Sequence, residues 1–180
     1  MIMKESFNLD ISKFTKVLKY LLYFSLFALF FVLEGLPSGF PLIFSVKPML
    51  VLSLLVILSL LESEMSTIFF ALIAGFLLDV GMAPLGVSSL FLCIVCTFLS
   101  NFSKKKFHVR VLSATLSTFI VALLYSLYIF TAVYLIPGSE RASIIFVDRF
   151  IPSILYTVLV SPLMYILILT IYTAFKKKLN

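Results

Sequence analysis

Long apolar runs separated by short polar breaks are the main pattern along this chain of 180 residues. Each run approaches the roughly 20 residues that a helix needs to cross a bilayer. Proline, glycine and charged residues gather in the breaks, where a helix is expected to end. The pattern predicts six transmembrane helices, at residues 17–36, 41–61, 65–80, 85–102, 111–136 and 150–175.

Two parts of this pattern are compatible with more than one helix boundary or conformation. In the N-terminal segment 1–16, Phe7, Ile11 and Phe14 recur at helical spacing among lysines. That spacing is typical of a short amphipathic helix on a membrane surface, and a frayed basic terminus is the alternative. The second run could begin near Pro41 or near Pro48, because proline is tolerated in the first turn of a helix.

Composition shows that these runs belong in lipid. Hydrophobic residues make up 62% of the chain, charged residues only 12%, and the mean hydropathy is +1.20. Soluble domains carry about 25% charged residues, so a water-soluble fold could not hide this much apolar surface. We therefore expect one all-α domain over residues 1–180, a polytopic membrane helix bundle with no extramembrane catalytic domain. The first run lacks a cleavage pattern and is expected to be retained as a helix.

Lysine and arginine placement predicts the orientation, because these residues concentrate in cytoplasmic segments. With six spans and the N-terminus inside, eleven of the 14 basic residues lie on the cytoplasmic side. The other three, Lys47, Arg141 and Arg149, lie outside. Both termini are therefore expected in the cytoplasm, and the membrane is expected to be a cytoplasmic (inner) membrane. Anionic lipid headgroups account for the net charge of +6, so no nucleic-acid partner is expected.

The sequence contains no set of residues typical of catalysis or of metal binding. It has no glycine-rich phosphate loop, and its single histidine, His108, has no neighbouring ligands. Cys93 and Cys96 form a C-x-x-C pair inside an apolar run, where we interpret them as small lipid-embedded side chains. We expect no enzymatic activity, no cofactor and no metal.

The most informative stretch begins at Ala71. Ala71, Gly75 and Asp79 are spaced by four, so they share a helix face on which small residues allow a second helix to approach closely. A carboxylate in a membrane helix is costly and suggests a specific role. Asp79 could hold the following turn, bind a ligand or proton, or contact a partner. Its charge could be capped by the turn backbone or paired with Lys47 or Arg149.

Other positions suggest packing or polar contacts. Ala114, Thr118 and Ala122 form a second small stripe, which we predict to be a helix-packing seam. Four charged residues near the outer ends of the spans are candidates for a polar pocket or a partner contact: Glu34, Lys47, Arg141 and Arg149. A transporter or channel would usually show inverted repeats or broken helices, and the sequence shows neither clearly.

Three motifs within residues 47–100 occur in a characteristic order. Lys47-Pro48 opens an apolar run, Gly75-Phe76-Leu77-Leu78-Asp79 follows a short polar loop, and Pro84-Leu85-Gly86 leads into the next run. This order resembles the rod shape-determining protein MreD family, whose hallmark is a glycine, three hydrophobic residues and an aspartate, then a small-residue turn and P/T-L-G. One position differs, because Met49 stands where the family often has Asp or Asn.

The resemblance implies a noncatalytic membrane subunit of the bacterial cell-elongation (rod) complex. Such proteins work with an MreC-like membrane protein, and indirectly with the actin-like MreB and the glycosyltransferase–transpeptidase pair that builds side-wall peptidoglycan. By the same resemblance, five residues shape a helix hairpin that holds the bundle together or presents it to MreC: Gly75, Asp79, Pro84, Leu85 and Gly86.

Two alternatives remain open from the sequence. The first is the substrate-binding membrane subunit of an energy-coupling-factor vitamin transporter, which is similar in length and number of spans. Such a subunit needs a polar pocket facing outward, for which Glu34, Asp79, Arg141 and Arg149 are sparse candidates. The second is an ion channel. Cell rounding on depletion would favour the shape-determining role, whereas a growth defect cured by a vitamin would favour the transporter.

Overall fold

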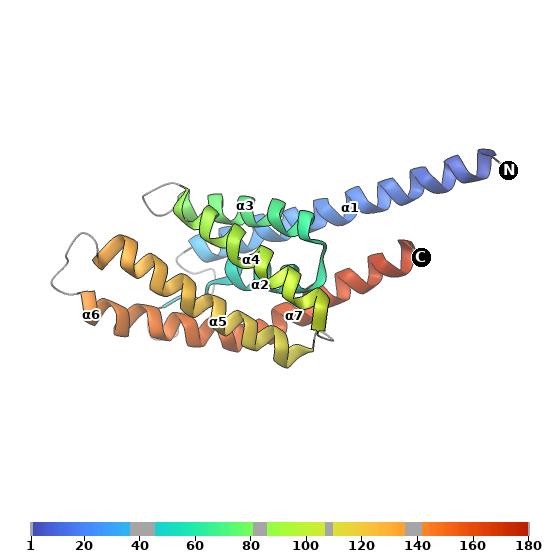
Figure 1. Cartoon of the computed structure of the whole chain (residues 1–180). Helices are drawn as coiled ribbons and strands as arrows, with labels where there is room; N and C mark the ends of the chain where they lie inside the picture. Colours follow the sequence, from blue (N-terminus) through green and yellow to red (C-terminus); the bar gives the residue numbers. More distant parts are fainter. Residues whose placement is uncertain (1, 37–45, 81–85, 107–109, 136–141, 180) are drawn as a thin grey trace.

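The computed structural model describes residues 2–36, 46–80, 86–106, 110–135 and 142–179 (Figure 1). These residues form helices and their connections, so the all-α prediction is confirmed for them. The elements in chain order are α1 (Ile2–Gly35), α2 (Leu50–Leu61), α3 (Glu64–Val80), α4 (Val87–Lys106), α5 (Val111–Phe130), the π-helix η1 (Thr131–Leu135), α6 (Ala142–Ile145), the π-helix η2 (Phe146–Phe150) and α7 (Ile151–Leu179).

Three of the described helical stretches are long and apolar enough to cross a membrane. They are Phe14–Gly35, Val111–Val133 and Phe146–Lys177, and Leu50–Leu61 and Ser88–Asn101 are shorter apolar helices. Large apolar side chains cover the outward faces of the bundle, as lipid-facing surfaces require. The chain is therefore a membrane protein.

Both termini lie at the same end of the bundle, and α6 lies at the opposite end (Figure 1). We call these the terminal end and the far end. The chain therefore traverses the bundle an even number of times. Lys47 and Arg149 lie at the far end, since Lys47 contacts the last turn of α1 and Arg149 is in η2. The N-terminal basic residues and Lys176 lie toward the terminal end.

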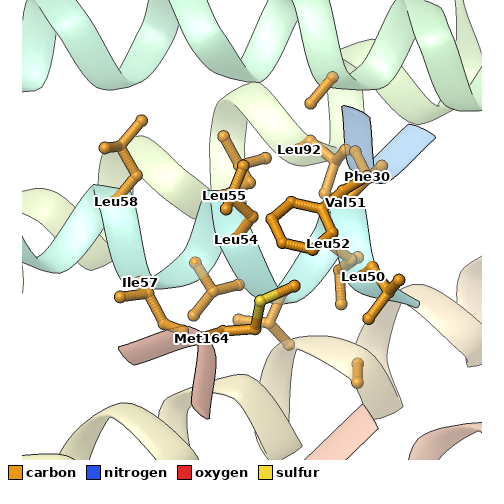
Figure 2. Close-up of a cluster of buried hydrophobic side chains, with 14 of the residues drawn as sticks. Phe30, Leu50, Val51, Leu52, Leu54, Leu55, Ile57, Leu58, Leu92 and Met164 are labelled. Atoms are coloured by element: carbon orange, nitrogen blue, oxygen red, sulfur yellow. The ribbon is translucent and has the colours of Figure 1, made fainter. Parts of the chain in front are cut away.

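Helix α2 is the centre of the bundle. Every residue from Leu50 to Ser59 is buried, and Phe30 of α1, Leu92 of α4 and Met164 of α7 surround it (Figure 2). Its 12 residues rise only about 18 Å, whereas the hydrocarbon core of a bilayer is about 30 Å thick. Helix α2 is therefore a core element that does not cross a membrane by itself.

Of the two starts left open for the second apolar run, near Pro41 and near Pro48, the described residues agree with the later one. Residues 46–49 are not helical, and α2 begins only at Leu50. Pro48 explains this start, because proline lacks an N–H and disfavours helical geometry in the preceding residue. Pro41 lies outside the described residues.

Helix α1 also differs from the expected separation of a surface segment and a span. It is one helix of 34 residues, about 51 Å long, so residues 2–16 continue directly into the membrane-spanning part. The first turns of α1 extend beyond the rest of the bundle at the terminal end (Figure 1). The expected fifth run, 111–136, corresponds to α5 followed by η1, which together cover residues 111–135. The expected sixth run, 150–175, is extended by α6 and η2 before α7 and continues to Leu179.

Candidate functional site

The α3–α4 hairpin is organised around Asp79, in the last turn of α3. Its side chain is buried, with 3% of its surface exposed. The carboxylate accepts hydrogen bonds from the backbone N–H of Gly86 at 2.9 Å and of Ser88 at 3.0 Å. The N–H and Oγ–H of Ser89 also donate to it, at 3.4 and 3.2 Å. Asp79 therefore caps the N-terminus of α4 from the preceding helix, where a negative charge also complements the helix dipole.

Gly75 lets α3 and α4 meet along this hairpin. A Cβ at Gly75 would clash with the Cα of Ser89 and lie 2.8 Å from its backbone N and its Oγ. Only a residue without a side chain allows this approach. At the other end of the turn, Gly86 has a φ of +94°, which a residue with a Cβ adopts at a cost. Gly75 therefore allows the close approach of the two helices, and Gly86 allows the backbone conformation of the turn.

The first turn of α4 joins the hairpin to α5. The Oγ of Ser88 and the Oη of Tyr125 are 3.1 Å apart and share a hydrogen bond. Phe91 stacks on Tyr128 with ring centroids 4.7 Å apart and also contacts the ring of Tyr125. The capped start of α4 is therefore tied to a third helix.

The predicted small-residue seams lie inside the bundle. Ala71 on α3 is fully buried beside Gly75, and Ala114, Thr118 and Ala122 are buried on one face of α5. We did not predict a third buried small stripe on α7, formed by Ser153, Thr157 and Ser161. Its spacing of four residues is visible in the sequence and could have revealed it.

The α7 stripe supplies partners to the non-helical segment before α2. Ser153 Oγ donates to the carbonyl of Lys47 at 2.8 Å, and Thr157 Oγ1 accepts from the N–H of Met49 at 2.8 Å. Backbone groups away from water need such partners. Residues 46–49 are therefore a non-helical segment that is held against α7 directly before α2 begins.

We expect Thr157→Val to destabilise the protein by about 1 kcal/mol, because the Met49 N–H would lose its acceptor inside the bundle. Unfolding by denaturant in detergent micelles measures the loss. Thr170→Val is the matched control, since the Thr170 hydroxyl is exposed and bonds only to the carbonyl of Ile166 in its own helix. Equal stability of the two variants would contradict this role of Thr157.

Glu34 and Lys47 together satisfy the ends of α1 and α2. Glu34 Oε2 accepts from the N–H of Val51 at 3.2 Å, so this carboxylate caps α2 as Asp79 caps α4. Lys47 Nζ donates to the carbonyls of Glu34 and Leu36 at 2.9 and 2.8 Å, which neutralises the C-terminal end of α1. These contacts are within the chain.

The remaining predicted residues separate into two groups. Arg149 is exposed in η2, and the hydrogen bonds of the Asp79 carboxylate come from the hairpin itself. Arg141, Pro84 and Leu85 lie outside the described residues. Across the described ranges, no three His, Cys, Asp or Glu side chains gather closely enough to hold a metal ion.

A buried ion pair at the terminal end was not predicted. Lys19 of α1 pairs with Glu62, the residue that ends α2, and both side chains are nearly buried. Tyr23 Oη donates to Glu62 Oε1 at 3.0 Å, and the Lys19 ammonium lies 5.2 Å from the ring centroid of Tyr172 on α7. No pattern in the sequence indicates this pair, because the apolar run around Lys19 does not reveal a partner far along the chain.

Comparison with known proteins gives one match. A family model described as rod shape-determining protein MreD matches residues 14–175, which includes the α3–α4 hairpin. No curated protein and no solved structure matches the chain. The matched region covers nearly the whole chain, so the chain belongs to the MreD family of rod shape-determining proteins.

Proposed function

We propose that this protein is a noncatalytic membrane subunit of the bacterial cell-elongation complex. Its role is to help maintain rod shape by linking an MreC-like membrane protein, and through it MreB, to side-wall peptidoglycan synthesis. The observation that carries this proposal is the family match over residues 14–175. Few of the described residues lie outside helices, which supports a protein that acts through contacts between helices.

The proposed location is the bacterial cytoplasmic membrane, crossed several times with both termini in the cytoplasm. The basic residues near the two termini support this orientation, because lysine and arginine favour the cytoplasmic side. Membrane lipids are the other partners in this proposal, with anionic headgroups at the basic terminal end.

Within this role, the α3–α4 hairpin presents the bundle to the MreC-like protein. Asp79 fixes the start of α4 through backbone N–H groups, and Gly75 sets the spacing of the two helices. The outward stripe of this hairpin carries large apolar side chains that can contact lipid or another membrane helix: Met65, Phe69, Leu72, Phe76, Leu90, Ile94 and Phe98. The hairpin is therefore the proposed place to test partner binding.

We expect Asp79→Ala to weaken rod shape and recovery of the MreC-like protein in a strain depleted of the native protein. The N–H groups of Gly86, Ser88 and Ser89 would lose their shared acceptor, so the hairpin would no longer hold one geometry. Cell width, protein level in membranes and co-purification measure the outcome. Asp148→Ala, at an exposed aspartate in η2, is the control.

Unchanged cell shape, protein level and co-purification in the Asp79→Ala strain would contradict the proposed role of the hairpin. A normal protein level with lost co-purification would place the defect at the partner contact rather than in folding. Membership of the MreD family argues against the vitamin-transporter and ion-channel alternatives. If depleted cells stayed rod-shaped and showed a growth defect that a vitamin cures, the result would favour the transporter function instead.

A further inference from the structure

The α3–α4 hairpin is bounded by polar contacts at both of its ends. At the terminal end, the side-chain amide of Asn101 donates to a carboxylate oxygen of Glu64 at 3.0 Å, and this contact is exposed. At the far end, Asp79 accepts hydrogen bonds from N–H groups at the start of α4. Glu64 and Asp79 are 15 residues apart in α3, which is about 23 Å along the helix. The apolar part of this hairpin is therefore short.

Helix α4 and the outward surface of α3 have the same limited length. The apolar part of α4, Ser88–Asn101, is about 21 Å long. The exposed apolar side chains of α3 extend from Met65 to Val80, which is again about 23 Å. The hydrocarbon core of a typical bilayer is about 30 Å thick, so both helices are too short to match it.

The other side of the bundle is longer. Helices α3 and α4 lie on one side of α2, α5 and α7 lie on the other, and α6 lies beyond the far ends of α3 and α4 (Figure 1). The apolar stretches Val111–Val133 and Phe146–Lys177 contain 23 and 32 residues, so they are about 35 and 48 Å long. The hydrophobic height of the bundle therefore differs between its two sides.

Lipid beside the hairpin has to adapt to the smaller height. The last carbonyls of a helix have no partner within that helix, and hydrocarbon offers none, so the far end of α3 requires water or headgroups nearby. Tilting α3 would increase the mismatch, because a tilted helix spans less of the membrane. A helix too short for its bilayer is accommodated when the bilayer becomes thinner beside it.

We propose that the α3–α4 hairpin thins the bilayer beside it and binds lipids with short acyl chains in preference to lipids with long ones. The α7 side has no such preference, because its apolar length exceeds the hydrocarbon core. The interaction surface is the outward stripe of the hairpin, and its partner is the acyl-chain region of phospholipids. This proposal concerns lipid alone and is independent of the proposed role in the elongation complex.

Tryptophan fluorescence tests the lipid preference, because the chain contains no tryptophan of its own. Phe76→Trp places one on the hairpin, and Leu159→Trp places the matched control on α7, at side chains that are 60% and 69% exposed. Each position is within one helical turn of a far-end polar contact, made by Asp79 or Thr157. A brominated phospholipid quenches the tryptophan that it touches, so competition between myristoleoyl and brominated oleoyl phosphatidylcholine in vesicles gives the relative affinity at each surface.

We expect the shorter myristoleoyl lipid to compete about threefold better at Phe76→Trp than at Leu159→Trp. A second variant tests whether hydrophobic length is the cause. Glu64→Leu with Asn101→Leu extends the apolar surface of the hairpin at the terminal end and, combined with Phe76→Trp, should reduce the difference to below about twofold. Circular dichroism of the purified proteins in the same vesicles verifies their helical content.

Equal competition at Phe76→Trp and Leu159→Trp would overturn the proposal, because the bilayer would then have one thickness around the bundle. An undiminished difference after Glu64→Leu and Asn101→Leu would also overturn it, since the choice of lipid would not depend on hydrophobic length. Purified protein in vesicles meets lipid alone, so neither result bears on the contact with the MreC-like protein.

Discussion

Replacing Gly75 by leucine is expected to lower the free energy of unfolding by about 3 kcal/mol, at the upper end of the cost of overpacking a buried site. The Cβ alone would clash with the Cα of Ser89 and come within 2.8 Å of its backbone N and its Oγ. Two of these three atoms are backbone, so a change of rotamer cannot relieve the contact. Moving Ser89 would also pull its N–H away from Asp79.

Thermal unfolding in micelles, followed by circular dichroism, measures this effect. Gly35→Leu is the matched control, because a Cβ at Gly35 would meet nothing within 4 Å. We expect the control to unfold close to the wild type. A Gly75→Leu protein as stable as Gly35→Leu would show that α3 and α4 can separate freely. The close approach of the two helices would then contribute nothing to the stability of the protein.

The α3–α4 hairpin shows how far sequence reasoning reaches. A glycine and an aspartate spaced by four, followed by a turn and a helix start, restrict the side chains to one helix face near the turn. The spacing therefore suggested a close helix approach at Gly75 and left several roles open for Asp79. The structure selects the option in which the turn backbone caps the carboxylate, and it identifies the donors as the N–H groups of Gly86 and Ser88.

The second apolar run shows where sequence reasoning stops. Lys47 and Pro48 left the start of the run open between Pro41 and Pro48. The run alone, however, cannot reveal that α2 is only 12 residues long and lies at the centre of the bundle. Its first turn depends on Glu34 from α1 and on Thr157 from α7, far away in the sequence. Such contacts arise from tertiary packing, and a single sequence gives no signal for pairing these residues.

The same limit applies to charges near the ends of spans. Lys19, Glu34 and Lys47 are each compatible with a side chain that reaches water, which is the ordinary expectation for a charged residue near a membrane surface. In the structure, Lys47 instead binds the last carbonyls of α1, and Lys19 pairs with Glu62. These charged residues cap helix ends and join helices, so they contribute to the stability of the bundle as well as to its orientation in the membrane.

The Lys19–Glu62 pair should therefore be among the most sensitive positions of the chain. We expect Glu62→Ala to cost about 3–5 kcal/mol, because it leaves a nearly buried ammonium without its counter-charge. Tyr23 would also lose the acceptor of its hydroxyl. Denaturant unfolding in micelles measures the cost, and Glu64→Ala is the control, because the Asn101 hydrogen bond to Glu64 is exposed and contributes about 1 kcal/mol or less.

A double variant separates the cost of an unpaired charge from the loss of an attraction. Lys19→Met combined with Glu62→Ala removes both charges, so the double variant should be more stable than Glu62→Ala alone, although one interaction fewer remains. Additive losses from the two single variants would contradict this, because they would mean that neither charge is harmed by losing the other. In that case water would solvate both charges, and the arrangement of α1, α2 and α7 at the terminal end would not depend on the pair.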